Sequence, residues 1–393
     1  MPVSRVPKPR LLFISNLFPD AAEPWRGLDN ATLLHALADR WDIRVIAVRP
    51  TLPFRGRKCE PRETDRVFHP HYIPTLYVPR IGHRVNPALM ARSLAGPLRV
   101  VRGQFDVALS SWIYPDSCAV ARLAREQGFP FAAIAQGSDV HQYLRIPARR
   151  KIIAADLPGA AAVITRSADL ANQLASIGLA REKLHPVYNG IDHECFQPGD
   201  RAAARKELGL PESARIVLFV GNFYPIKHPM LLLETFAELR GEDEFENTML
   251  VFVGGGPLED DLRWRANRDC AEGVIFAGRR SAAGVALCMQ AADVLCLPSV
   301  YEGVPNVILE AFACGLPVVA SRVGGIPEVH PGEKFGRLVP PGDIPALYDA
   351  LRAVLRDRLD REPIRGHARQ FTWARAADAY DGILHAALNG AVK

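Results

Sequence analysis

The segment from Val294 to Ala320 decides the fold, and it reads VLCLPSVYEGVPNVILEAFACGLPVVA. Its first four residues are apolar and predict a buried strand, and Pro317–Ala320 predicts another. Between them, Val307–Cys314 has the apolar spacing of a helix and follows a loop rich in turn formers. A strand, a helix and a strand in succession indicate a parallel sheet covered by helices.

The same alternation extends outward from this segment. Upstream, a helix is expected near Met230–Arg240, and strands are expected at Ile216–Val220, Leu250–Val253 and Val274–Phe276. A second series of apolar runs occupies the N-terminal half, at Leu11–Phe18, Arg44–Val48, Phe105–Leu109, Phe131–Ala135 and Ala162–Thr165. Turn formers at Phe196–Asp200 separate the two series. We therefore predict an α/β fold with two domains, residues 1–197 and residues 198–370.

The composition fits a globular chain with two cores. The chain has 393 residues, of which 48% are hydrophobic and 23% are charged. Its seven cysteines are odd in number and lack C-x-x-C spacing, so we expect reduced, mostly buried thiols and no zinc site. The clearest apolar runs are far shorter than the roughly 20 residues that span a bilayer. The N-terminal run Leu11–Ile14 fits a first strand better than a signal peptide, so we expect a cytoplasmic protein.

The net charge of +5 is only mildly basic. The sequence has no aromatic-interleaved basic repeat of the kind that binds single-stranded nucleic acid. An anionic small ligand or an anionic membrane surface accounts for the charge. We therefore expect no nucleic-acid partner.

Charged residues and glycines follow the predicted strands, at the edge where doubly wound sheets bind ligands. Lys227 comes shortly before a helix start, whose unpaired N–H groups attract anions. Gly254–Gly256 allows a ligand to approach the backbone closely. Glu302 lies in a loop, and Glu310 lies one turn inside a helix among apolar neighbours, where a carboxylate needs a partner. Each feature also has an ordinary alternative to ligand binding. Lys227 could be a solvated surface lysine, Gly254–Gly256 a tight turn, and the two glutamates solvated residues beside a helix.

These residues belong to a longer pattern. Glu302 and Glu310 match an E-x7-E motif, set in E-G-x-P-N and E-A-x-A-C-G-x-P-V-V. In this pattern the chain resembles the retaining GT-B glycosyltransferases of family 4. The resemblance covers residues 130–345 well. Its further matching stretches are Asn189–Asp192, Phe196–Pro198, Gly254–Pro257, Val323–Glu328 and Val339–Asp343.

The resemblance implies a GT-B fold, with two Rossmann-like domains that face each other across a cleft. The N-terminal domain would bind the acceptor, and the C-terminal domain, residues 198–370, would bind a nucleotide sugar. A C-terminal helix within residues 371–393, where Trp373, Ala376 and Tyr380 have helical spacing, would cross back to the N-terminal domain. The implied enzyme is a metal-independent glycosyltransferase of the hexosyltransferase type, with no cofactor and a UDP- or GDP-linked sugar as co-substrate. Its acceptor would be a glycan or a lipid-linked glycan in cell-surface polysaccharide biosynthesis.

By the same resemblance, Glu310 binds the nucleotide ribose, Glu302 the donor sugar and Lys227 the diphosphate. No two aspartates are spaced as D-x-D, the metal-binding pattern of another glycosyltransferase class. The catalytic candidates are Glu302, Lys227, Asp139 and Gln136. The donor-binding candidates are Glu310, Gly303, Val304, Pro305, Asn306, Asn222, Gly221, Gly255 and Arg279.

The donor side departs from the family pattern at one position. Asn222 stands where similar enzymes usually have a phosphate-binding arginine, which leaves Lys227 as the one clear cation. Arg279, Arg280 and Arg322 are the candidates to replace it, and the sequence does not choose among them.

The acceptor side departs as well. Gln136 replaces the usual histidine of an H-G-x-D loop, and a glutamine side chain cannot act as an acid or a base. Asp139 fits either a site residue or a helix cap, and His141 fits either a compensating or a structural histidine.

Three other possibilities stay open at this stage. The chain could be a weakened sugar-nucleotide-binding partner subunit or a nucleotide-sugar epimerase of the same architecture. The basic amphipathic segment Asn86–Arg102 and the cluster Arg145–Lys151 fit either a solvated face or peripheral contact with the inner face of the plasma membrane.

Overall fold

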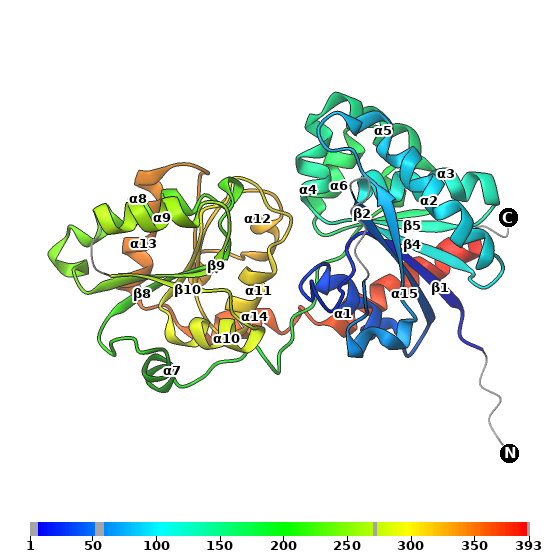
Figure 1. The fold of residues 1–393 in the computed structure, drawn as a ribbon. Helices are drawn as coiled ribbons and strands as arrows, with labels where there is room; N and C mark the ends of the chain where they lie inside the picture. The colour runs from blue at the N-terminus through cyan, green and yellow to red at the C-terminus, as the bar shows by residue number, and fades with distance from the viewer. Residues whose placement is uncertain (1–6, 52–58, 270–272, 391–393) are drawn as a thin grey trace, which may run out of the picture. The chain divides into compact units, whose positions relative to one another are not determined.

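The computed structural model describes residues 7–51, 59–269 and 273–390. It divides into two compact units (Figure 1). The first unit contains the residues up to Asn189 together with those from Trp373 onward, and the second contains Gly190–Thr372.

A parallel sheet of seven strands forms the centre of the first unit, in the order β3-β2-β1-β4-β5-β6-β7. Its strands are β1 Arg10–Ser15, β2 Asp42–Thr51, β3 His71–Leu76, β4 Val107–Ser111, β5 Phe131–Ala135, β6 Ala162–Thr165 and β7 Leu184–Pro186. Its helices are α1 Leu28–Leu37, α2 Asn86–Val100, α3 Cys118–Gln127, α4 Ser138–His141, α5 Pro147–Asp156, α6 Ala168–Ala175 and α15 Trp373–Gly390.

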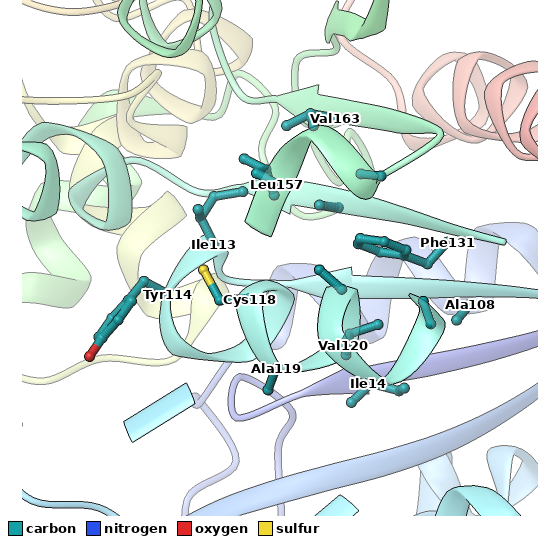
Figure 2. Packing of buried hydrophobic residues seen from close by; sticks show 14 of the residues in the cluster. Ile14, Ala108, Ile113, Tyr114, Cys118, Ala119, Val120, Phe131, Leu157 and Val163 are labelled. Carbon is teal, nitrogen blue, oxygen red and sulfur yellow. The ribbon is translucent and has the colours of Figure 1, made fainter. Parts of the chain in front are cut away.

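Helices cover both faces of this sheet. Successive side chains of a strand point to opposite sides, so an apolar strand needs a covering layer on each side. In β1, Ile14 belongs to the apolar cluster that packs on α3, whereas Phe13 belongs to the cluster that includes α1 and α15. Figure 2 shows the first cluster, in which Ala108 of β4 and Phe131 of β5 lie near Val120 of α3. A strand buried on both faces reads as a continuous apolar run, as the sequence of β1 does.

The C-terminal helix α15 packs within the first unit, although nearly two hundred residues separate it from the rest of that unit. Its Ala377 and Tyr380 are fully buried in the same cluster as α1, and Trp41 donates its indole N–H to Asp381 at 2.7 Å. The predicted return of the C-terminal helix to the N-terminal domain is thus confirmed.

The second unit has a parallel sheet of six strands, in the order β10-β9-β8-β11-β12-β13. Helix α8 packs against α9 and α13, and α11 packs against α10 and α14. The strands are β8 Arg215–Asn222, β9 Thr248–Gly255, β10 Val274–Gly278, β11 Val294–Leu297, β12 Val318–Ser321 and β13 Gly336–Val339. The helices are α7 Arg201–Leu208, α8 Pro229–Arg240, α9 Glu259–Asp269, α10 Ala282–Ala291, α11 Asn306–Ala313, α12 Ile326–Val329, α13 Ile344–Asp357 and α14 Arg361–Ala368.

The predicted α/β class with two Rossmann-like domains is confirmed, and every strand expected from an apolar run forms. Three strands were not predicted, namely β3, β7 and β13, and each lies at an edge of its sheet. In the part of the chain that the structure describes, the six cysteines are free thiols, four of them buried; Cys270 lies outside that part. Among the helices described, none combines the length and the apolar character needed to cross a bilayer.

Candidate functional site

The first group of candidate residues lies where the strands of the second sheet end. Strands β8 and β11 are neighbours in this sheet, so the loops that follow them leave the same edge side by side. The loop after β8 forms a short turn at Pro225–Lys227, directly before α8. The loop after β11 carries Glu302 and leads into α11. A hydrogen bond from the Val300 N–H to the Ile226 carbonyl, 2.8 Å long, joins the two loops.

An ion pair joins the two loops through their side chains. The ammonium nitrogen of Lys227 lies 2.5 Å from Oε1 of Glu302. The buried hydroxyl of Ser299 donates to the same oxygen at 2.6 Å. The Glu302 side chain is 8% exposed and the Lys227 side chain 25% exposed. The structure therefore brings together two residues that lie 75 positions apart, and the lysine neutralises the carboxylate charge.

The loop that holds Glu302 rests directly on a glycine turn. Gly324 has a φ of +53°, and a Cβ there would lie 1.8 Å from the Glu302 carbonyl oxygen. The adjacent Gly325 donates its N–H to the carbonyl of Gly303 at 2.8 Å. Only a residue without a side chain fits at position 324 without moving the loop. The stretch Val323–Glu328, which resembles the family pattern, therefore packs directly against the backbone of the Glu302 loop.

Helix α11 presents Glu310 and a helix start in the same segment. Pro305 occupies the N-cap, where its ring offers no side-chain acceptor to the first N–H groups of the helix. Glu310 is half-buried between the buried Leu309 and Ala311. Burial, and then the negative charge of Glu310, raise the pKa of the Cys314 thiol to about 12. The segment thus combines helix N–H groups with a carboxylate one turn further along.

Three donor-side candidates meet at the ends of β8, β9 and β10. Asn222 pairs with Gly255 in the register of β8 and β9, and the Asn222 amide oxygen accepts a hydrogen bond from Nη1 of Arg279 at 3.2 Å. Arg279 follows β10, whereas the other two candidate arginines turn to backbone carbonyls. Nε of Arg280 donates to Ala277 at 3.0 Å, and Nη2 of Arg322 lies 3.5 Å from the Leu338 oxygen.

Of the two glycines that end β9, the backbone requires the first. Gly254 has a φ of +141°, and a Cβ there would lie 1.9 Å from the carbonyl oxygen of Gly221. At Gly255 a Cβ would lie 3.6 Å from Nε of Arg279 and 3.2 Å from Oε2 of Glu259. The arginine side chain therefore lies directly against the backbone of β9 at this edge.

In the first unit, Gln136 lies at the end of β5 and both ends of its amide are engaged. Its Nε2 donates to Asn30 at 2.8 Å and to Ser111 at 2.7 Å. Its Oε1 accepts from Nε of Arg166, a 3% exposed residue that follows β6, at 3.3 Å. The glutamine thus joins α1 to the ends of β4, β5 and β6. Sequence reasoning missed Arg166, although a charged residue directly after a predicted strand was a usable signal.

Asp139 is fully buried and accepts hydrogen bonds from three backbone N–H groups. The donors are Ile113 at 2.8 Å, Gln136 at 3.0 Å and Gly137 at 2.7 Å. The carboxylate therefore fastens the loop after β4 to the loop after β5. Burial raises the pKa of Asp139 to about 6, and the three N–H donors oppose that rise. Gly137 is the N-cap of α4, so the same carboxylate also holds the start of its own helix.

A second buried carboxylate, Asp116, lies near Asp139 and was not predicted. It accepts from the backbone N–H of Asn16 at 2.6 Å and from the Asn16 amide at 2.9 Å. Burial, and to a lesser degree the negative charge of Asp139, raise the pKa of Asp116 to about 7, and the hydrogen bonds from Asn16 oppose that rise. A carboxyl with this pKa is divided between its two protonation states at neutral pH.

His141 is buried and bonded within the first unit. Its Nδ1 lies 2.8 Å from the Gln173 amide nitrogen, and its Nε2 lies 3.5 Å from Asp169. These contacts fit the structural interpretation of His141 and offer no sign that it replaces an acid or base at position 136.

Two family models match this chain. Residues 30–194 match the model described as Glycosyltransferase Family 4. Residues 214–357 match the model described as Glycosyl transferases group 1. Together the two matches cover most of both units.

Relatives of known name are similar over part of the chain. A D-inositol 3-phosphate glycosyltransferase of Saccharomonospora viridis is 34% identical over 270 residues, which are 65% of this chain and 62% of the relative. One of Mycolicibacterium smegmatis is 34% identical over 262 residues, which are 63% of this chain and 57% of the relative. The aligned part thus spans about three fifths of the length of these relatives.

Solved structures share the fold over nearly the whole chain. Sucrose-phosphate synthase of Thermosynechococcus elongatus superposes with a TM-score of 0.75 at 22% identity, covering 96% of this chain and 98% of that one. Anabaena HepE in complex with UDP has a TM-score of 0.77 at 18% identity, with 96% and 99% covered. At these identities the likeness concerns the fold.

Proposed function

We propose that this chain, which matches glycosyltransferase family models over residues 30–194 and 214–357, transfers a sugar from a nucleoside diphosphate sugar with retention of anomeric configuration. The observation that carries the proposal is the ion pair between Lys227 and Glu302, beside the start of α11. It places a cation, a carboxylate and helix N–H groups at the edge of a parallel sheet where such folds bind ligands.

Each part of this constellation matches one part of the donor. The diphosphate needs positive charge and N–H donors, which Lys227 and the segment Gly303–Asn306 would supply. The hydroxyl groups of the ribose and of the sugar need acceptors, which Glu310 and Glu302 would supply. When the diphosphate binds, it competes with Glu302 for Lys227, so the carboxylate becomes available to sugar hydroxyls.

In the proposed reaction the bond between the anomeric carbon and the diphosphate oxygen breaks, and a bond to the acceptor oxygen forms. The transition state has oxocarbenium character, as in glycoside hydrolysis. Negative charge develops on the leaving diphosphate, where Lys227 and the helix N–H groups would stabilise it. The leaving oxygen takes the acceptor proton, so the mechanism needs no nucleophile from the protein. The anomeric configuration of the product, read by NMR, tests this step, because an inverted product would exclude it.

The first unit would bind the acceptor, which we propose to be a glycan or a lipid-linked glycan. In this arrangement Gln136 and Asp139 position the loops after β4 and β5 through the hydrogen bonds described above. The curated relatives are named for inositol 3-phosphate, so this acceptor belongs in the same assay. Transfer to inositol 3-phosphate but to no glycan would correct the proposed acceptor while leaving the donor intact.

A membrane-facing surface fits a lipid-linked acceptor. No acidic residue occurs between Asp65 and Asp106, whereas this stretch contains six arginines. Apolar side chains are exposed in the same stretch, with Ile81 at 87% and Val100 at 75%. Exposed apolar groups among cations suit the surface of an anionic bilayer. We propose peripheral attachment on the cytoplasmic side, and equal flotation with neutral and anionic liposomes would contradict it.

The donor is tested first by thermal stabilisation. A ligand that binds only the folded state raises the unfolding temperature by mass action. HepE, which shares this fold, was solved with UDP and with UDP-glucose, so UDP-linked sugars are the first probes and GDP- and ADP-linked sugars follow. We expect one series to stabilise the protein and to support transfer. If none of the three series stabilises it, the proposed donor site is wrong.

The variant Glu310→Ala addresses the site itself. Loss of a charged hydrogen-bond partner should weaken donor binding about tenfold to a hundredfold, since such bonds contribute about 1.5–3 kcal/mol. The control is Glu238→Ala, which removes an exposed glutamate from α8 of the same unit. Equal affinity in both variants would place the donor elsewhere.

Two other activities remain distinguishable in the same assays. A partner subunit would bind the donor without transferring or hydrolysing it. An epimerase would change the sugar of the donor when no acceptor is added.

A further inference from the structure

Lys227 and Arg279 both follow strands of the second sheet, and they differ in how their charge is balanced. Lys227 is paired with the carboxylate of Glu302. Arg279 instead donates to Asn222, whose amide carries no charge. Oε1 of nearby Glu259 is paired with the Arg263 guanidinium, 2.9 Å away, and its Oε2 faces Gly255. In the part of the chain that the structure describes, no carboxylate lies within ion-pair distance of Arg279, so its positive charge is available to an anionic ligand.

The position of Arg279 follows from the order of the strands. Arg279 comes after β10 and Asn222 ends β8, and β9 lies between these strands. Neighbouring strands are about 4.8 Å apart, so the arginine must extend across the end of β9 to reach Asn222. Residue 255 of β9, which it crosses, is a glycine, and a Cβ there would lie in contact with the arginine side chain, 3.6 Å from its Nε. The guanidinium therefore lies beside the glycine turn and on the same sheet edge as Lys227.

We propose that Arg279 binds the diphosphate of the donor together with Lys227, and that Asn222 holds its guanidinium in place. This inference rests on the proposed donor site and adds a phosphate ligand to it. A cation at the end of β10 thereby replaces the arginine expected at position 222, at the end of β8. Arg280 and Arg322 are directed elsewhere. Nε of Arg280 turns back to the carbonyl of Ala277 in β10, and Nη2 of Arg322 lies near the carbonyl of Leu338 in β13, which β11 and β12 separate from β8.

If Arg279 supplies the cation in place of an arginine at position 222, an asparagine is suitable at position 222. An arginine there would bring a second guanidinium to the place that Arg279 occupies, and the two charges would repel each other. The short amide of asparagine instead offers an oxygen that accepts from Arg279. The pair Asn222 and Arg279 is therefore a single unit, in which one residue carries the charge and the other directs it.

The test compares a nucleoside diphosphate with its nucleoside, because only the first carries phosphate. The probe is whichever of UDP, GDP and ADP stabilises the wild-type protein most, and affinity is measured by calorimetry. Arg279→Ala should weaken the diphosphate about tenfold or more and leave the nucleoside unchanged. Arg280→Ala is the matched control, an adjacent exposed arginine whose loss should alter neither affinity.

A second variant tests whether an arginine at the end of β8, at position 222, can replace Arg279. In the Arg279→Ala background, Asn222→Arg should restore most of the diphosphate affinity. The inference is overturned if Arg279→Ala binds the diphosphate as the wild type does. It is also overturned if the loss is equal for the nucleoside or is not restored by Asn222→Arg, because Arg279 would then act through the fold.

The wild-type protein and Lys227→Ala separate this failure from failure of the proposed function. If the wild type binds the diphosphate and Lys227→Ala weakens it, the donor site stands whatever Arg279 does. If the wild type binds none of the three diphosphates, the donor site itself is refuted.

Discussion

Replacement of Lys227 by alanine should damage both stability and donor binding, and the two effects can be separated. The ammonium group lies 2.5 Å from a carboxylate that is 8% exposed. Removing one member of a buried ion pair costs about 3–5 kcal/mol, because the other charge remains buried. The lysine side chain is 25% exposed, so solvent screens the ion pair and reduces this cost. We therefore expect Lys227→Ala to lower the free energy of unfolding by about 2 kcal/mol. For a unit of this size that loss lowers the unfolding temperature by about 4–8 °C.

The double variant Lys227→Ala with Glu302→Gln isolates the buried charge as the cause. Glutamine keeps the shape of Glu302 and carries no charge, so most of the lost stability should return. Diphosphate affinity should stay low, because the cation is still missing. Scanning calorimetry follows the unfolding of the second unit, and titration calorimetry follows binding. The control is Lys206→Ala, which removes an exposed lysine of α7.

Two outcomes would refute this reasoning. If Lys227→Ala unfolds at the wild-type temperature, the ion pair contributes nothing to stability. If the double variant is as unstable as the single one, a remaining charge at Glu302 is not what destabilises the unit. Recovery of diphosphate affinity in the double variant would show that Lys227 acts only by neutralising Glu302.

Two further variants test the supports of each unit. Gly324→Ala should destabilise the second unit and weaken donor binding, because its Cβ would lie 1.8 Å from the Glu302 carbonyl oxygen. Gly342→Ala is the control, since its φ of +78° is also positive but no atom would lie within 4 Å of its Cβ. If both variants lose the same stability, the cause is backbone strain at a positive φ and not the contact with Glu302. For Asp116, burial raises the pKa in the folded state to about 7, so its contribution to stability is full below about pH 4 and is lost as the pH rises through 7. That loss is at most about 4 kcal/mol. Asp116→Asn should therefore flatten the dependence of the unfolding free energy on pH between about 4 and 8, measured by denaturant titrations. If the slope is unchanged in the variant, the pH dependence comes from other groups.

The strands that could be predicted are those buried on both faces. The central strands β1, β4, β5, β8 and β9 read as continuous apolar runs, because helices cover both sides of the sheet. The missed strands have weaker patterns. β3 alternates exposed and buried residues and contains Pro74, and β7 has only three residues. An edge strand has one neighbour and fewer apolar contacts, so its sequence carries less of the signal.

The sequence singled out candidate site residues but did not show which of them meet. Lys227 and Glu302 each follow a strand, and the neighbouring positions of β8 and β11 bring them together. The contact between Arg279 and Asn222 depends on side chains that cross a third strand, so no spacing along the chain could indicate it. Asp116 escaped notice because its role depends on the backbone N–H and side-chain amide of Asn16, a hundred positions away, and such a contact leaves no pattern of residue types.

The placement of α15 has a consequence for the order in which the protein folds during synthesis. Ribosomes release a chain from its N-terminus, and domains generally fold as units once their residues have emerged. Every residue of the second unit, Gly190–Thr372, is made before Trp373, so this later stretch is complete first. The earlier stretch must wait for the last helix, which buries Ala377 and Tyr380 against it. During that interval its incomplete core exposes apolar surface to chaperones, and truncation before Trp373 would damage the first unit and not the second.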